Sequence, residues 1–321
     1  MKFLFLTDTH IRNNSPKSRL DDFEEAIEKK FYEISKIIKD NNIDYVLHGG
    51  DLFDRPDVSV KTVSKFGNIL KDLGVPIFII SGNHDIFGHN PKTIDRSMLG
   101  LLSSLDIVNL IEYNKPYILE FDNKKIQISG IPYIYNIDKE EKDYYKVKRL
   151  ENINLHIVLI HSLLLEKPFI KGIPYTLIDD IKDIDADIVL SGHYHTGFGI
   201  KKVDNKYFAN PGSVARLNNS SIEIKRKPKV LILEYKENNE IILEEVELKT
   251  AKNGKDIFDL NDNSAELRYE SLEEFKLMIR QNTELSNYNI YSIIEDIAIK
   301  KSIPKEILDE AIKRINDGKE E

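Results

Sequence analysis

The chain has no cysteine among its 321 residues. Disulfide bonds and thiolate metal sites are therefore excluded, so any bound metal has to be held by nitrogen and oxygen atoms. The sequence also lacks an apolar run of the ~20 residues that a membrane-spanning helix needs. Its start, MKFLFLTDTH, becomes acidic too early to predict a signal peptide. We therefore expect a cytoplasmic protein with no membrane association.

An excess of positive charge is absent as well. The 46 Lys and Arg residues are outnumbered by 54 Asp and Glu residues, which gives a net charge of −8. The surface as a whole therefore does not favour a polyanionic partner, and nucleic-acid binding would depend on local basic patches or on bound metal. The length allows one large domain or two smaller ones.

Short apolar runs bounded by turn residues predict buried strands. These runs are KFLFL, YVLH, PIFIIS, KIQISGI, LHIVLIH, ADIVLS and KVLILEY. Amphipathic stretches at residues 19–41, 58–73 and 95–105 predict helices. From about residue 200 to about 248 we expect strands and no helices. The alternation of strands and helices is typical of a layered α/β fold with at least partly parallel sheets.

The C-terminal part differs in character. A polar stretch, TAKNGKDIFDLNDNS, follows the last predicted strand. Residues 257–321 then show helical patterns, are acidic, and carry no residue cluster suited to chemistry. We therefore predict one domain over residues 1–250 and a small helical appendage over residues 257–321. Its helices could dock on a partner or pack on the core.

Five of the predicted strands end in Asp, Asn or His. The residues are Asp8 and His10, Asp51, Asn83 and His84, His161, and His193 and His195. Five of the eight histidines of the chain fall in these positions. Ligands bind at the carboxyl edge of open α/β sheets, so we expect these side chains to converge.

This set of donors indicates a metal centre. Asp, Asn and His without Cys suit Mn, Fe or Zn, and about seven ligands are enough for two ions that share a carboxylate. Such pairs of ions serve displacement at phosphorus. Any one strand end alone could be a capped turn or a polar strand end, but the joint pattern favours metal. A binding module with an incomplete metal site is disfavoured because every expected ligand is present.

The order Asp-x-His, Gly-Asp-x-x-Asp, Gly-Asn-His-Asp, His, Gly-His-x-His resembles the calcineurin-like metallophosphoesterases over roughly residues 1–235. The resemblance implies a four-layer sandwich of two packed mixed sheets flanked by helices. It implies that one ion takes Asp8, His10 and His195, that the other takes Asn83, His161 and His193, and that Asp51 bridges them. His84 would then assist the leaving oxygen, and Asp54 would hold His84 in orientation.

Within that superfamily, GGDLFDR and SGNHD are most similar to the SbcD-type DNA repair nucleases, in their bacterial and phage style. The resemblance implies exonuclease and endonuclease action on DNA with two ions, most simply Mn²⁺. It also implies a homodimer and an SbcC-like SMC-type ATPase that binds the C-terminal helices. The chain after residue 250 is short for the DNA-capping domain of larger relatives. The alternative function, which the net charge favours, is a phosphodiesterase or phosphatase for a small molecule or a phosphoprotein.

Two arginines are candidate substrate contacts. Arg55 and Arg216 could bind a phosphate, or they could form solvated salt bridges. The basic stretch at residues 222–229 could lie along a DNA backbone or form a solvated strand edge.

The remaining histidines and two tyrosines are predicted to have packing roles. We expect His48 and His156 to be core residues and His89 to lie in a surface loop. For Tyr133 and Tyr135 we favour packing over stacking on a base.

Overall fold

The computed structural model describes residues 1–139, 142–169, 173–259, 305, 308–309 and 312. It divides into two units, one of Met1–Glu166 with Tyr175–Asn261 and the other of Lys167–Pro174 with Asp262–Glu321. The helices and strands described below belong to the first unit. Most of the predicted helical appendage at residues 257–321 lies outside the described residues.

The first of two six-stranded sheets has the order β14-β13-β1-β2-β3-β4. Its strands are β1 (Lys2–Leu6), β2 (Tyr45–His48), β3 (Ile77–Ile79), β4 (Asn109–Leu110), β13 (Lys229–Tyr235) and β14 (Ile241–Glu247). Strands β1 to β4 run parallel, whereas β13 is antiparallel to both β1 and β14. The parallel strands therefore end at the same edge of this sheet.

The second sheet has the order β11-β12-β10-β7-β6-β5. Its strands are β5 (Tyr117–Phe121), β6 (Lys124–Ile131), β7 (Leu155–Ser162), β10 (Ile188–His193), β11 (Gly199–Val203) and β12 (Lys206–Asn210). The four central strands are parallel and both edge strands are antiparallel. A short parallel pair is formed by β8 (Leu164–Leu165) and β9 (Thr176–Leu177).

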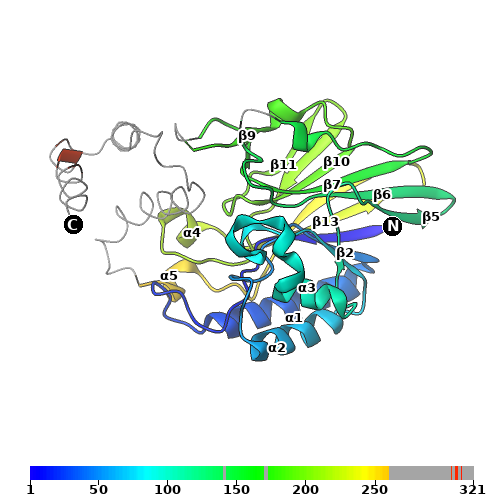
Figure 1. The fold of residues 1–321 in the computed structure, drawn as a ribbon. Coiled ribbons are helices and arrows are strands. Elements are labelled where there is room, and N and C mark those ends of the chain that lie inside the picture. The colour runs from blue at the N-terminus through cyan, green and yellow to red at the C-terminus, as the bar shows by residue number, and fades with distance from the viewer. Residues whose placement is uncertain (140–141, 170–172, 260–304, 306–307, 310–311, 313–321) are drawn as a thin grey trace. The chain divides into compact units, whose positions relative to one another are not determined.

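Three helices cover the outer face of the first sheet, as Figure 1 shows. They are α1 (Phe23–Asn41), α2 (Val60–Lys71) and α3 (Met98–Ser104). Helix α1 begins where the Asp22 side chain accepts a hydrogen bond from the Glu25 backbone N–H. Short 3₁₀ helices complete the connections: η1 (Asn83–Asp85), η2 (Phe87–His89), η3 (Pro91–Arg96), η4 (Asp143–Tyr145) and η5 (Ile178–Ile181).

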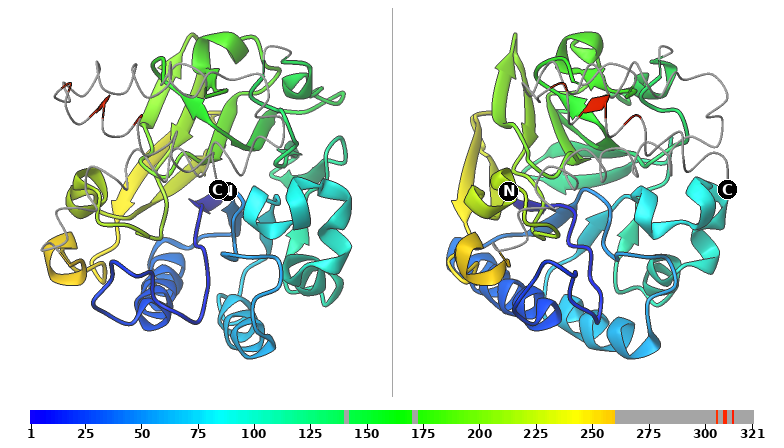
Figure 2. Two further views of the ribbon diagram at one scale, coloured as in Figure 1. Left: turned by 60° about the vertical axis from the view of Figure 1, so that its left-hand side comes forward. Right: turned by 90° about the vertical axis from the view of Figure 1, so that its left-hand side faces the viewer.

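The layers follow from strands that are apolar on both faces. In β1, Phe3 and Phe5 pack between the two sheets, while Leu4 and Leu6 pack under the helices. This alternation is the two-residue period of a strand buried on both sides. A third apolar cluster covers the outer face of the second sheet. Figure 2 shows the sheets and helices from two further directions. The predicted arrangement of two packed mixed sheets with flanking helices is confirmed.

All seven predicted strands are present, as are the three predicted helices, the last of which begins only at Met98. The expectation of strands without helices from about residue 200 to about 248 is wrong, because one short helix lies in that range. Helix α4 (Ser221–Lys225) begins where the Ser220 side chain accepts the Glu223 N–H, and α5 (Gly254–Ile257) follows later. The basic stretch 222–229 is therefore not a strand edge over most of its length.

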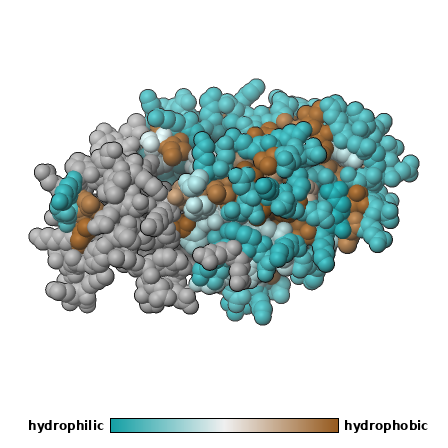
Figure 3. Space-filling model, turned by 90° about the horizontal axis from the view of Figure 1, so that it is seen from above, coloured by the Kyte–Doolittle hydropathy of each residue, from teal (hydrophilic) through white to brown (hydrophobic). Residues whose placement is uncertain are grey.

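Polar side chains dominate the face seen in Figure 3, with hydrophobic residues in patches between them. Within the part of the chain that the structure describes, no helix is both long and apolar enough to span a membrane.

Candidate metal centre

The carboxyl ends of β1, β2 and β3 in one sheet, and of β7 and β10 in the other, carry the predicted ligands. Their His and Asp side chains fall in two groups, and the ligand atoms within each group lie within 4.8 Å of one another; a third such group joins His10 to Asp54 and His84. One group is Asp8, His10, Asp51 and His195, and the other is Asp51, His161 and His193. The structure therefore brings these side chains together, and Asp51 belongs to both groups.

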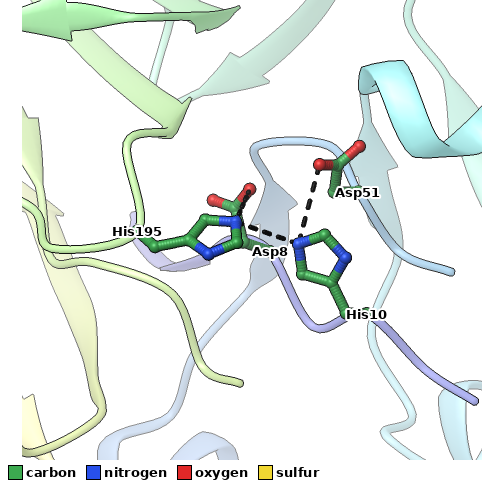
Figure 4. Close-up of side chains that lie close together, drawn as sticks. All are labelled: Asp8, His10, Asp51 and His195. Atoms are coloured by element: carbon green, nitrogen blue, oxygen red, sulfur yellow. Dashed lines mark hydrogen bonds and ion pairs between the residues drawn. The ribbon is translucent and has the colours of Figure 1, made fainter. Parts of the chain in front are cut away.

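Figure 4 shows the first group. The Nε2 atoms of His10 and His195 are 3.0 Å apart. His10 Nε2 lies 3.6 Å from Asp51 Oδ2, and His195 Nε2 lies 3.6 Å from Asp8 Oδ1. The side chains of Asp8 and His10 are fully buried, whereas that of His195 is 32% exposed. His195 therefore lies on the open side of this group.

The second group is built around His161. Its Nε2 atom lies 3.4 Å from Asp51 Oδ2 and 3.1 Å from Asn83 Oδ1, so the amide of Asn83 joins this group. The His161 Nδ1–H donates to the Gly49 carbonyl at 2.7 Å. This bond fixes the tautomer and leaves Nε2 to face the cluster. The ring of His193 lies 5.0 Å from that of His161.

The donors fit a pair of cations. Asp51 Oδ2 approaches both His10 and His161, yet it is buried and has no hydrogen-bond partner within the described residues. Its only compensation there is the ion-pair contact with these rings, at 3.6 and 3.4 Å. A divalent ion on each side of this oxygen would satisfy it, and nitrogen and oxygen donors of this kind suit Mn²⁺, Fe²⁺ or Zn²⁺.

Burial and neighbouring charge set the protonation of the ligands. Burial lowers the pKa of His10 and of His193 well below the ordinary value, so both rings are neutral. Metal ligands must be neutral imidazoles or carboxylates, so both rings are ready to bind. Burial also lowers the pKa of His161, but the charge of Asp51 outweighs it and raises the pKa to about 9.

The backbone at the ligands is unusual. Asp8, His10, Asp51 and His193 all have positive φ angles, of 52°, 43°, 53° and 74°. Non-glycine residues in this region cost of order 1–3 kcal/mol each and cluster at functional sites. Two positions near these side chains require glycine because neighbouring atoms leave no room for a Cβ atom. A Cβ atom at Gly192 would lie 2.3 Å from Thr7 Oγ1, and one at Gly82 would lie 2.0 Å from Asp51 Oδ1.

His84 lies beside the cluster with its ring edge-on to His10, the centroids 4.7 Å apart. Its backbone N–H donates to Asp51 Oδ1 at 2.9 Å. Its Nδ1–H donates to Asp54 at 2.8 Å, but to the backbone carbonyl. The Asp54 carboxylate instead pairs with Arg12 at 3.0 Å and lies 3.7 Å from His10 Nδ1. Asp54 thus contacts His84 through an atom that any residue type would supply.

Asp85 is a site residue to which the sequence motif gave no role. Its buried carboxylate accepts the backbone N–H groups of Gly82 at 2.9 Å, Asp51 at 2.8 Å and Phe53 at 3.2 Å. It therefore ties the loop after β2 to the loop after β3. An acidic residue two positions after Asn83 is visible in the sequence, but the backbone groups that it binds are not.

The two arginines that were candidate substrate contacts lie in different settings. The Arg55 side chain is 69% exposed and pairs with Asp57 at 3.0 Å, which matches the solvated salt bridge. Arg216 is 2% exposed, and its guanidinium donates to the carbonyls of Arg226 and Lys252. Because these bonds hold it inside the protein, Arg216 is not placed to meet a substrate.

His48 and His156 are buried with hydrogen-bond partners, as predicted. Burial lowers the pKa of His48 to about 3, so this ring is neutral. Tyr133 is 5% exposed, which agrees with packing. Its ring lies 5.6 Å from that of His89 and 6.1 Å from that of His193. His89 is thus half-buried against Tyr133, whose ring also lies near that of His193.

This fold and this cluster of His and Asp side chains fit a metal-dependent phosphoesterase. The model for the family Calcineurin-like phosphoesterase matches residues 1–197, more than half of the chain, and the chain belongs to this family. Several similar proteins carry the name DNA double-strand break repair protein Mre11. The one from Methanococcus maripaludis is 28% identical over 71% of this chain and 60% of that protein. The one from Saccharolobus solfataricus is 30% identical over 43% of this chain and 35% of that protein.

A third relative of that name, from Sulfurisphaera tokodaii, is 25% identical over 98% of this chain and 78% of that protein. The chain thus spans less than two thirds of the length of the first two relatives. Among solved structures, the protein TT1561 of Thermus thermophilus is similar at a TM-score of 0.46 and 12% identity, over 77% of this chain and 99% of that chain.

Proposed function

We propose that this chain is a metal-dependent phosphodiesterase that hydrolyses DNA, with an SbcD-like role in repair or recombination. The observation that carries the proposal is the buried Asp51 Oδ2, which lies 3.6 Å from His10 Nε2 and 3.4 Å from His161 Nε2 without a hydrogen-bond partner in the described part of the chain. A carboxylate shared in this way fits a two-metal centre and has no evident purpose in an apolar core.

In this proposal Asp8, His10 and His195 hold one ion, Asn83, His161 and His193 hold the other, and Asp51 bridges them. Bound here, two such ions, most simply Mn²⁺, would supply a water molecule of lowered pKa and would neutralise phosphoryl oxygens. His84 donates a proton to the leaving oxygen. Burial lowers the pKa of His84, but the charge of Asp51 and the Asp54 carbonyl outweigh it and raise the pKa above its ordinary value, which favours a protonated ring.

DNA is preferred as the substrate because three similar proteins are named for double-strand break repair. By the same likeness we propose a homodimer and an SbcC-like ATPase partner that binds residues 257–321, with the cytoplasm as the location. Co-purification of the chain with such an ATPase, and its loss on deletion of residues 257–321, would test the partner.

The substrate is tested with hairpin and single-stranded DNA, each with Mn²⁺ and with EDTA. A matched aryl phosphodiester reports on the centre itself. We expect Mn²⁺-dependent cleavage of DNA. Hydrolysis of the aryl diester without cleavage of any DNA would refute the DNA assignment and favour the small-molecule phosphodiesterase. If neither DNA nor the aryl diester is hydrolysed although Mn²⁺ is bound, the proposal that the chain is a phosphodiesterase is refuted.

A further inference from the structure

The segment that follows β12 is buried although it forms neither helix nor strand. Residues 211–216 are all buried. Irregular segments normally run over the surface, because a buried backbone leaves N–H and carbonyl groups that must find partners. We call this segment the 213–216 loop, after the residues that make the contacts. The hydrogen-bond partners of its backbone groups fall into two sets.

The amide side of the loop holds the metal ligands. The N–H of Ser213 donates to the His195 carbonyl at 2.9 Å, and the N–H of Ala215 donates to the Asp8 carbonyl at 3.2 Å. The Ser213 hydroxyl adds a bond of 2.7 Å to the same Asp8 carbonyl. Between them, the N–H of Val214 donates to the Thr7 carbonyl at 3.1 Å. The loop thus joins the end of β1 to the segment after β10.

The carbonyl side of the loop is held by cations. Lys30 Nζ, from the middle of α1, donates to the Val214 carbonyl at 2.6 Å. Arg226 donates to the carbonyls of Ser213 and Ala215, and Arg19 donates to the Arg216 carbonyl at 2.9 Å. Four successive carbonyls are therefore each bound by a cationic side chain. We call Lys30, Arg19 and Arg226 the cationic clamp.

Burying the side chains of the cationic clamp lowers the stability of the fold. Lys30 is 2% exposed and Arg19 is 7% exposed. Burial and the charges of Arg19 and Arg216 lower the pKa of Lys30 well below its ordinary value. Arg19 pairs with Asp21 and Arg226 pairs with Glu223, but no ion pair of Lys30 is found among the described residues. Burying Lys30 beside these cations costs stability, and an apolar side chain of similar volume at position 30 would avoid that cost. Stability therefore does not explain why a lysine stands at position 30.

We infer that the cationic clamp is a positioning device for Asp8 and His195, the two ligands whose backbones the 213–216 loop holds. This inference rests on the metal centre of the proposed function. Lys30, Arg19 and Arg226 fix the loop from behind, so that its amide groups keep both ligands at the separation that one ion requires. The clamp contacts neither Asn83 nor His161 in the described part of the chain, so it acts on one ion more than on the other.

The test is Lys30→Met, which keeps most of the length of the side chain and removes its charge and its bond to Val214. Binding of Mn²⁺ alone is followed by the loss of the free-ion EPR signal, and thermal unfolding is followed in parallel. Partners behind metal ligands typically contribute 10–100-fold to affinity. We expect one of two Mn²⁺ affinities to fall by about tenfold or more and the other to change little. In a His195→Ala background, Lys30→Met should have no further effect on the remaining site.

The matched control is Lys29→Met, on the same helix, because Lys29 is exposed and pairs only with Glu25 among the described residues. It should leave both affinities unchanged. If Lys30→Met does not fold, Arg226→Lys replaces it, since a lysine keeps the charge but reaches only one of the two carbonyls. A variant that unfolds at a lower temperature but binds both ions with wild-type affinity would overturn the inference. A variant that loses both affinities equally would overturn it as well. Because no DNA is present, a failure of the DNA assignment cannot imitate either result.

Discussion

Replacing His84 by Asn separates proton donation from metal binding. The backbone N–H of His84 donates to Asp51 Oδ1, and this bond survives any side-chain change at position 84. The imidazole Nδ1–H donates to the Asp54 carbonyl, and Nε2 has no hydrogen-bond partner within the described residues. The ring is therefore oriented at one nitrogen and open at the other. An asparagine keeps a similar polarity but has no proton to give at neutral pH.

The expected loss follows from the leaving group. A positioned general acid contributes about 10²–10⁴-fold, which is about 3–5 kcal/mol at 1.36 kcal/mol for each factor of ten. The larger figure applies to DNA, whose leaving alkoxide needs a proton. A nitrophenolate leaves without one, so the same variant should hydrolyse an aryl diester almost as fast as the wild type does.

The assay compares kcat for a hairpin DNA and for an aryl diester in wild type and His84→Asn, with Mn²⁺ content measured on the same samples. We expect a large loss of kcat on DNA, a small loss on the aryl diester, and unchanged metal content. Two results would show the reasoning to be wrong. Equal losses on both substrates would mean that His84 stabilises the phosphoryl group, and a large loss of Mn²⁺ would mean that it is a ligand.

Further predictions concern the residues around the ligands. Asp54→Ala should lower kcat on DNA much less than His84→Asn, because the carbonyl that holds His84 remains; an equal loss would show that the Asp54 carboxylate is needed. The affinity for Mn²⁺ should rise with pH up to about 9, because His161 in the metal-free protein has a pKa of about 9 and must lose its proton to bind. Calorimetry at pH 7 in two buffers of different ionisation enthalpy should therefore detect proton release, and its absence would contradict a protonated His161. Mn²⁺ at 100 times the Kd of each site should raise the free energy of unfolding by about 2.7 kcal/mol for each of the two sites, and Asp51→Asn should abolish most of this gain; an equal gain in that variant would place the ions elsewhere.

The convergence of these side chains could be predicted from sequence because each follows a short apolar run, and parallel strands place such positions at one edge of a sheet. Asp51 lies close to side chains from both sheets, and the assignment of the ligands to two ions stays a prediction. The position of Arg216 could not be predicted, because an arginine after a turn looks the same in sequence whether it faces solvent or interior. Helix α4 was missed because IEIK alternates like a strand, while Ser220, which caps the helix, is the stronger local signal.

The residues that hold the backbone around the centre could not be predicted from the sequence, for a different reason. Asp85 and Lys30 act on backbone groups, and a backbone group carries no residue type that a motif could record. Asp85 holds the N–H of Asp51 from a neighbouring strand end, and Lys30 reaches Val214, which is 184 positions away in the chain. Such pairs become visible only when the strands are placed. The strained φ angles of Asp8, His10, Asp51 and His193 require supports of this kind, because left-handed backbone persists only where surrounding bonds hold it. The motif therefore specifies which atoms can bind ions, and the buried polar groups behind it determine whether those atoms meet.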